Sequence, residues 1–137
     1  MTRINQIPVE ELSDQHLIRE YNEIPRFIKQ NINTADAPAT YCLGKGHVKW
    51  GRLHWQFCLD RYNLVCNEMY YRGFTVNYPH KDLSKFTVNT PMPLSIPYTS
   101  TEQDITLSRN RIIEKIKMKP NWYRWTKRER PSYTIFN

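Results

Sequence analysis

The start of the sequence carries a group whose type suits covalent chemistry at an electrophilic carbon. Thr2 follows the initiator methionine, and because threonine is small we expect Met1 to be removed, which exposes the Thr2 α-amine. An α-amine has a pKa of about 7.7–8.0, so a useful fraction of it is neutral at physiological pH. A neutral amine attacks an electrophilic carbon and holds it as an imine. Thr2 is therefore a candidate nucleophile.

Glu23 lies among charged residues of the predicted first helix. His16 precedes it by about two helical turns, and Arg19 and Arg26 lie about one turn to either side. Taken alone, this pattern favours a solvated helix charge that pairs with Arg19 at i, i+4, and the free amine of Thr2 is the reason to consider a further role.

Positive charge is concentrated near the C-terminal end. The 137 residues carry a net charge of +7 with a pI of about 9.4. Residues 109–130 contain nine basic and two acidic residues, and the remainder is neutral. Aromatic residues interleave with these cations: Trp122, Tyr123, Trp125 and Tyr133. Because cations neutralise phosphates and rings stack on bases, we expect a nucleic-acid partner; a solvated helix face followed by a tail packed on the core is the alternative.

Composition excludes several other classes of protein. No apolar run approaches the roughly 20 residues of a membrane span, and the N-terminus lacks the apolar region of a secretory signal. Three cysteines without a close pair predict no disulfide framework and favour a reducing, intracellular setting. His54, Cys58 and Cys66 have a spacing that zinc could use, but no fourth ligand accompanies them. We therefore expect neither a metal nor a cofactor, and no membrane partner.

Hydrophobic periodicity predicts the elements that position these groups: one all-α domain over residues 1–137 with three principal helices. Apolar residues recur at three- and four-residue steps in the first of them: Leu17, Ile18, Tyr21, Ile24 and Ile28. Ser13 caps this helix, which begins near Asp14, and Pro25 kinks it or ends a turn there.

The other two helices are predicted further along the chain. One runs from Val48 to Arg72 and is followed by Gly73, a residue suited to the position after a helix. Residues 75–103 are rich in proline, threonine, serine and asparagine, which predicts a long irregular connection. Asp104 caps the third helix, which stops before Pro120. An irregular aromatic and basic tail follows.

Several blocks of sequence carry a family resemblance. They are Met1-Thr2-Arg3-Ile4-Asn5, Asp14-Gln15-His16-Leu17, Glu20-Tyr21-Asn22-Glu23-Ile24-Pro25-Arg26, Leu43-Gly44-Lys45-Gly46-His47-Val48, Arg72-Gly73-Phe74, Glu114-Lys115-Ile116 and Pro120-Asn121-Trp122-Tyr123. In order and rough spacing they resemble the bacteriophage endonuclease V family of pyrimidine-dimer DNA glycosylases with AP-lyase activity. The resemblance implies a compact domain of three helices that binds damaged double-stranded DNA. We expect the protein to be a monomer. A phage origin would place it in the cytoplasm of an infected bacterium.

The resemblance also implies a mechanism. In the family, the amine of the second residue, here Thr2, attacks the anomeric carbon of the damaged nucleotide, so that the glycosidic bond breaks and an imine forms. The matching glutamate, Glu23, stabilises the positive charge on the sugar and assists β-elimination of the 3′ phosphate. Imine formation acidifies the neighbouring sugar protons, so a weak base suffices for the elimination.

Binding roles follow by position. Arg3, His16 and Arg26 match residues that line the DNA-facing surface, and Arg111 and Lys115 match basic residues of the third helix that grip the backbone. Residues 122–125, Trp122-Tyr123-Arg124-Trp125, match the aromatic segment linked to recognition of damaged DNA. Family members extrude a base opposite the lesion, which costs least where the duplex is already damaged.

Three features depart from the family pattern. Asn22 replaces an arginine of the DNA-contacting cluster, the loop at 33–41 is shorter and less basic, and the tail beyond Trp125 differs. The alternatives are therefore the same chemistry on a different modified base, or a DNA-binding relative without catalysis.

Overall fold

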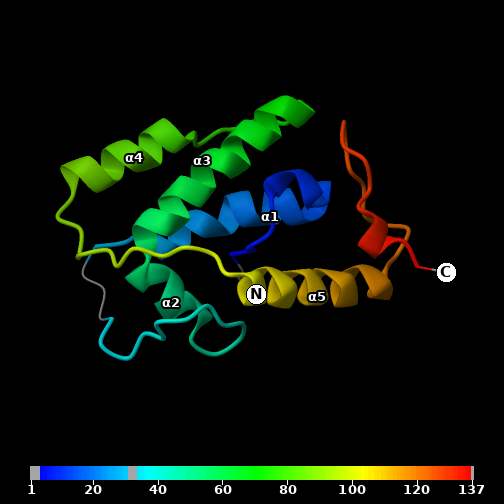
Figure 1. The fold of residues 1–137 in the computed structure, drawn as a ribbon. Coiled ribbons are helices and arrows are strands. Elements are labelled where there is room, and N and C mark those ends of the chain that lie inside the picture. Colours follow the sequence, from blue (N-terminus) through cyan, green and yellow to red (C-terminus); the bar gives the residue numbers. More distant parts are fainter. Residues whose placement is uncertain (1–3, 31–33, 137) are drawn as a thin grey trace.

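The computed structural model describes residues 4–30 and 34–136, which form a single all-helical body (Figure 1). Its α-helices are α1 (Asp14–Glu23), α2 (His47–Leu53), α3 (Trp55–Arg72), α4 (His80–Asn89) and α5 (Glu102–Met118). Three short 3-10 turns accompany them, Val9–Glu11, Ile24–Phe27 and Ser132–Thr134, and the described residues contain no strand. The all-α prediction is confirmed.

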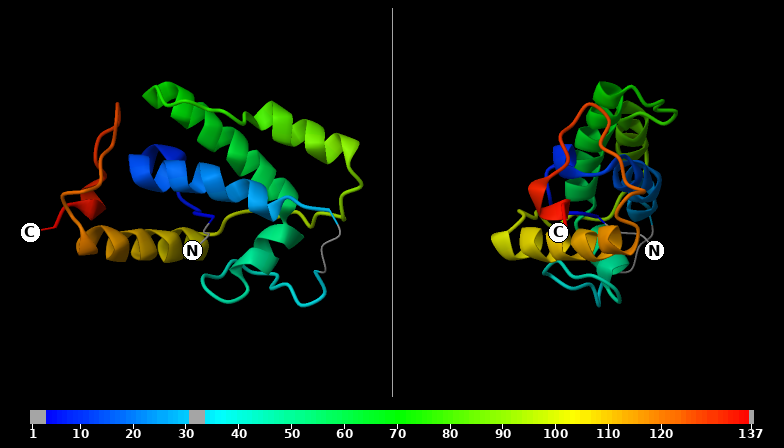
Figure 2. Two further views of the ribbon diagram at one scale, coloured as in Figure 1. Left: turned by 180° about the vertical axis from the view of Figure 1, so that it is seen from behind. Right: turned by 90° about the vertical axis from the view of Figure 1, so that its right-hand side faces the viewer.

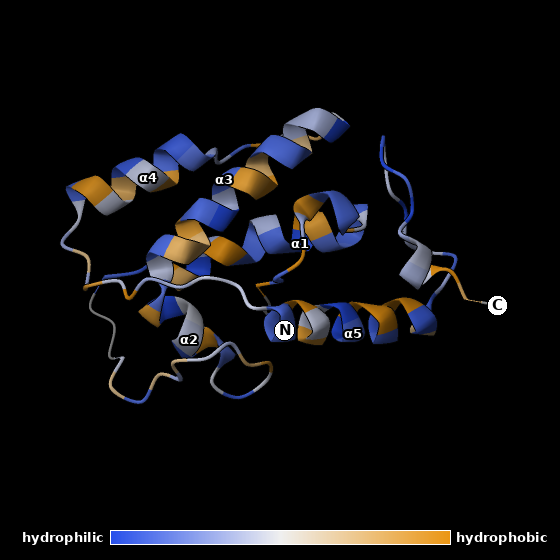
Figure 3. Ribbon diagram, viewed as in Figure 1, coloured by the Kyte–Doolittle hydropathy of each residue, from blue (hydrophilic) through white to orange (hydrophobic). Residues whose placement is uncertain are grey.

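Helix α3 forms the centre of the structure, with α1 and α4 packed against it. Figure 3 shows hydrophobic positions alternating with hydrophilic ones along these helices, as expected where one face of each is buried. The largest side chains of the core, Trp50, Phe27 and Tyr62, are completely buried. No helix in the described part of the chain is long and apolar enough to cross a membrane.

The first helix begins and ends as predicted. The Ser13 hydroxyl accepts a hydrogen bond from the His16 N–H, which satisfies one of the free donors at the start of α1. At the other end, Pro25 lies in the 3-10 turn Ile24–Phe27 that directly continues the helix. Glu23 is the last residue of α1, so this change of helical geometry determines where its carboxylate projects.

The predicted second helix, residues 48–72, is wrong as a continuous element because the chain changes direction at His54. This residue lies outside helical geometry, with φ −112° and ψ 43°, and separates α2 from α3. Its Nδ1 is 2.7 Å from the carbonyl oxygen of Ile96, and its ring packs against Trp50 and Tyr98. Contacts with a segment 42 residues away therefore favour the break, and local helical pattern does not reveal them.

The irregular connection predicted over residues 75–103 is also partly wrong, since it contains α4. Pro79 precedes the first turn in extended geometry, and Leu83 and Phe86 turn one face of α4 toward α3. The start of α5 differs as well: Thr101 is the cap, and Asp104 is the reciprocal member of a capping box. The predicted end of α5 before Pro120 and the position of Gly73 after α3, with φ 84°, are confirmed.

Candidate functional site

A cleft of about 550 Å³ lies between α1, α5 and the residues that follow α5. Seen from behind, α1 and α5 run one above the other with the tail crossing near one end (Figure 2). The residues that line the cleft are Asn5, Gln15, His16, Ile18, Arg19, Glu20, Asn22, Glu23, Arg111, Lys115, Trp122 and Tyr123. Seven of the twelve side chains predicted for the site therefore meet in one place, although they come from three separate parts of the sequence.

Glu23 lines the cleft at the end of α1, where its side chain is 17% exposed. The Arg26 guanidinium lies 3.1 Å from its carboxylate, and Arg26 itself is largely exposed. This pair spans i, i+3 across the transition from α1 to the 3-10 turn. Glu23 is thus a partly solvated carboxylate that lines the cleft and pairs with a cation.

Glu20, three residues earlier, is paired and completely buried instead. The Arg61 Nε from α3 lies 2.5 Å from one carboxylate oxygen, and the Asn5 side-chain amide donates to the other at 2.7 Å. Arg61 also donates to the carbonyl of Ile7. The buried ion pair thereby fastens the segment from Ile4 to Ile7, which is itself buried, beneath the cleft. Asn5, in the middle of this segment, lines the cleft.

His16 and Tyr123 form one wall of the cleft. Their rings stack with centroids 4.8 Å apart and planes 7° from parallel, and the His16 Nδ1 lies 2.8 Å from the Ser13 hydroxyl. Burial, together with the nearby charges of Arg111, Arg19 and Lys115, lowers the pKa of His16 from 6.5 to about 4. His16 is consequently neutral at physiological pH and acts there as a flat, uncharged surface.

The opposite side of the cleft is cationic. Arg111 and Lys115 lie one turn apart on α5 and both line the cleft, as their i, i+4 spacing predicts. Trp122 stands at the rim with 53% of its surface exposed, and the Lys119 ammonium lies 5.4 Å from its ring. The cleft thus combines positive charge, exposed aromatic surface and two carboxylates, the buried Glu20 and the partly exposed Glu23.

A comparison with known protein families finds a match over residues 1–82 to the family described as pyrimidine dimer DNA glycosylase. The match covers more than half of the chain and includes all of α1. The chain belongs to this family. DNA repair by glycosylase action is therefore its family-level function, and DNA is the substrate that the family acts on.

The cleft of this glycosylase is completed by residues beyond the matched part of the chain. Arg111, Lys115, Trp122 and Tyr123 all follow residue 82, and α1 contributes the facing side. The family match thus includes the α1 side of the cleft, whereas the side formed by α5 and the residues after it lies outside the matched range.

Some predicted site residues are placed elsewhere. The Trp125 indole donates to the carbonyl of Glu11 at 2.9 Å, and the Arg130 guanidinium lies 4.9 Å from its ring, so Trp125 anchors the tail. Arg124 uses its backbone N–H and carbonyl to contact Gln15 and Asp14. Thr2 and Arg3 lie outside the described residues. His54, Cys58 and Cys66 belong to no metal-binding group within the part of the chain that the structure describes.

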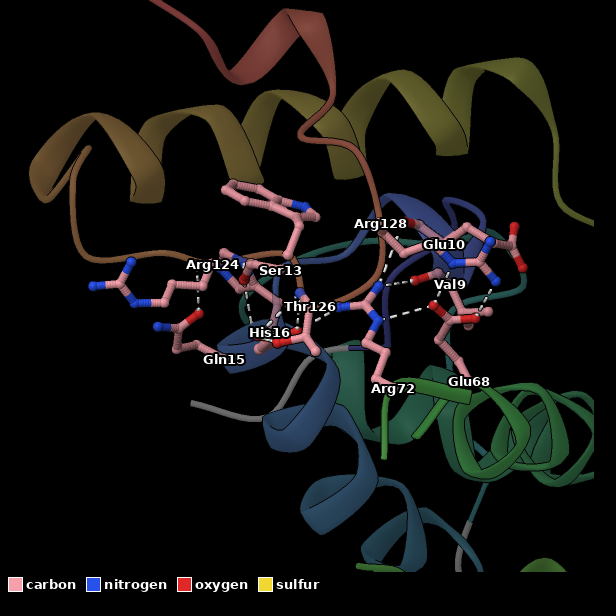
Figure 4. A network of polar contacts seen from close by, with 12 residues as sticks. Val9, Glu10, Ser13, Gln15, His16, Glu68, Arg72, Arg124, Thr126 and Arg128 are labelled. Carbon is pink, nitrogen blue, oxygen red and sulfur yellow. Dashed lines mark hydrogen bonds and ion pairs between the residues drawn. The ribbon is translucent and has the colours of Figure 1, made fainter. Parts of the chain in front are cut away.

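The tail, residues 119–136, is held to α1 and α3 by a polar network that we call the tail lock: Asp14, Glu68, Arg72, Thr126 and Arg128 (Figure 4). Asp14 accepts hydrogen bonds from the N–H and hydroxyl of Thr126 and pairs with Arg72 at 2.9 Å. Glu68 pairs with both Arg72 and Arg128 at 2.8 Å. These guanidiniums lower the pKa of Glu68, although burial opposes them. The lock brings Tyr123 back to α1.

Sequence reasoning missed Glu20, Arg61 and the tail lock, but helical spacing carried a signal for them. Glu20 lies on the buried stripe of α1 between Leu17 and Ile24. Arg61 and Arg72 likewise fall among the buried residues of α3. A charged residue on an apolar stripe requires a buried partner of opposite charge. That rule identifies the residues but does not say which partners they find.

Proposed function

We propose that this pyrimidine dimer DNA glycosylase is also an AP lyase, with the Thr2 α-amine as nucleophile and Glu23 as the acid–base group. The observation that carries the proposal is the position of Glu23 in a cleft that also contains Arg111 and Lys115. The cations suit the phosphates that flank a damaged nucleotide, and the carboxylate suits the sugar between them.

The position of Asn5 supports the role of Thr2. Asn5 lines the same cleft as Glu23 and is fastened there by Glu20. Thr2 precedes Asn5 by three residues, and three residues of chain span at most about 11 Å. A chain that starts at Thr2 thus keeps its amine within that reach of the cleft.

The proposed reaction has two stages. The neutral amine forms a bond to C1′ while the bond to the base nitrogen breaks, and Glu23 stabilises the positive charge that develops on the sugar. The amine then loses a proton, the ring C1′–O4′ bond opens as O4′ gains a proton, and an imine remains. Glu23 next removes a C2′ proton, and its electrons expel the 3′ phosphate oxygen. Hydrolysis of the imine finally releases the amine.

Borohydride trapping tests this proposal directly. Reduction during reaction with UV-irradiated duplex should join protein and DNA covalently, and peptide mapping should place the link on the amine of Thr2. Intact mass should show that Met1 has been removed. Trapping on a lysine side chain, or no trapping during active cleavage, would contradict the proposed nucleophile.

The variant Glu23→Gln tests the acid–base role. We expect strand cleavage to fall by about 10²–10⁴-fold, because the amide can neither take up a proton nor balance positive charge, while DNA binding remains within a few-fold. Glu102→Gln, an exposed glutamate on α5, is the matched control and should cleave normally. Cleavage by Glu23→Gln at the parent rate would overturn the assignment.

A second candidate function is the same chemistry on another modified base. It is favoured by Asn22, which lines the cleft and is exposed, at a position where the resemblance leads us to expect arginine. An uncharged amide makes base contacts different from those of a guanidinium. Duplexes with single defined lesions distinguish the two candidates: the lesion with the highest kcat/KM identifies the substrate, and Asn22→Arg should shift that preference toward pyrimidine dimers if this position sets it.

A further inference from the structure

Gln15 occupies an unusual place in the cleft, because its side chain contacts the backbone of the tail. The Gln15 Nε2 donates a hydrogen bond to the carbonyl of Trp122 at 2.8 Å. Its Oε1 accepts one from the N–H of Arg124 at 3.1 Å. The two bonded backbone groups flank Tyr123, so a single side-chain amide spans this residue. Figure 4 shows the Gln15 side chain directed at Arg124.

The neighbouring residues reinforce this contact. The Asp14 N–H donates to the carbonyl of Arg124 at 2.7 Å, so the first turn of α1 makes three hydrogen bonds to residues 122–124. His16 follows Gln15 directly and stacks on Tyr123. The residues on either side of Tyr123 are thus bonded to α1, and the Tyr123 ring lies against the same helix.

We propose that Gln15 is a positioning residue whose amide holds Tyr123 against His16 and so builds this wall of the cleft before DNA enters. A wall formed in advance spares the complex the ordering of the tail, which strengthens binding without changing the chemical step. The effect on catalysis rests on the proposed function, whereas the effect on the stack does not.

The first test measures the His16 pKa by NMR in Gln15→Met, a side chain of similar length that makes neither hydrogen bond. Burial is the largest cause of the low value and Tyr123 stacks on the ring, so loss of the stack should raise the pKa from about 4 by at least one unit toward 6.5. Ser13 and the charges of Arg19, Arg111 and Lys115 still face the ring and oppose a full return. Gln56→Met is the matched control, since Gln56 is exposed on α3 and bonds within its own helix to Asp60.

The second test uses the kinetics of cleavage on UV-irradiated duplex. Gln15→Met should raise KM by about tenfold with kcat within twofold of the parent, because two ordinary hydrogen bonds are lost from a binding surface. A merely structural role would change the melting temperature and leave both the His16 pKa and KM at their parent values in the folded protein. That result would overturn the proposal.

A double-variant cycle decides whether Gln15 acts through Tyr123. If it does, adding Gln15→Met to Tyr123→Ala changes neither the His16 pKa nor KM further. Additive effects of the two substitutions would instead mean that Gln15 contacts DNA itself, and would overturn the proposal. Should Gln15→Met fail to fold, Gln15→Glu keeps the acceptor for Arg124 and loses the donor to Trp122, and it should show smaller changes in the same directions. If the chain cleaves no DNA, the NMR measurements still test Gln15 while the proposed function fails separately.

Discussion

The cations of residues 109–130 divide into two groups with different surroundings. Arg111 and Lys115 line the cleft, where charge from α5 faces α1. Arg109, Arg128 and Arg130 instead contact protein groups: Arg109 pairs with Glu11 at 3.1 Å, Arg128 pairs with Glu68 at 2.8 Å, and Arg130 donates to the carbonyl of Thr134. The sequence presents one basic segment, whereas the structure places one part of it at the cleft and pairs another part with side chains and backbone elsewhere.

The aromatic residues divide in the same way. Tyr123 and Trp122 line the cleft, while Trp125 is bonded to Glu11 and covered by Arg130. Arg128 also lies 4.0 Å from the ring of Tyr71 on α3. The number of arginine and aromatic residues in a segment therefore does not predict how many of them can contact DNA, because some contact protein groups instead. The packed-tail interpretation is confirmed for part of the segment, and nucleic-acid binding stays a prediction for the part that lines the cleft.

The largest expected effect concerns the tail lock. Glu68 is 3% exposed and faces Arg72, whose side chain is completely buried, so Glu68→Gln leaves a buried guanidinium with less compensation. Breaking such a buried pair costs about 3 kcal/mol or more, which lowers the melting temperature by roughly 10 °C. Thermal unfolding measures this change in melting temperature. Gln56→Met is the control, because it removes a hydrogen bond between two exposed residues, Gln56 and Asp60. An unchanged melting temperature would mean that the lock does not stabilise the fold.

The pH dependence of stability should distinguish His16 in the cleft from Glu68 in the tail lock. The folded pKa of His16, about 4, lies below its ordinary value of 6.5, so its contribution to stability is complete above pH 6.5 and is lost as the pH falls toward 4. The pKa of Glu68 is lowered from 4.5, so its contribution is lost only below that pH. His16→Phe keeps a ring against Tyr123 and should remove the loss between pH 6.5 and 4, about 3 kcal/mol at most, in denaturant unfolding. A slope that persists in this variant would assign that window to another group.

The cleft cations should affect DNA binding. Replacing Arg111 and Lys115 by alanine removes two phosphate contacts, which should lower affinity by about tenfold or more and reduce the salt dependence, as a slope of log K against log salt, by about 1.8. Fluorescence anisotropy with duplex DNA at several salt concentrations measures both quantities. Arg109→Gln, two residues from Arg111 on the same helix, is the control and should bind like the parent. Equal losses in the two variants would remove the distinction between the groups.

Arg109→Gln itself has the smallest expected effect. Its side chain is 40% exposed and its partner Glu11 is 24% exposed, so solvent screens the pair. Such pairs contribute about 0–1 kcal/mol, and the melting temperature should fall by no more than a few degrees. A large destabilisation would show that the contact with Tyr133, whose ring lies 5.4 Å from the Arg109 guanidinium, matters more than the ion pair.

Helix α1 shows how much of the site the sequence could predict. The Ser13 cap, the apolar stripe and the turn at Pro25 are all local, and they place His16, Asn22 and Glu23 on one helix before any tertiary contact is known. Capping and periodicity involve residues within four positions of one another, which is why they could be recognised. The roles of Glu20 and Glu23 could not be separated in this way, because they differ by partners on other elements.

What the sequence determined alone was therefore the helical class, the start and end of α1, the C-terminal end of α5 and the residue types of the cleft, since each depends on near neighbours along the chain. Tertiary structure decided the break at His54, the packing of α4 on α3, the pairing of Glu20 with Arg61 and the division of the basic segment. In each of these cases the deciding partner lies far away in sequence, and a buried charge or ring is stable only where the fold brings that partner into contact.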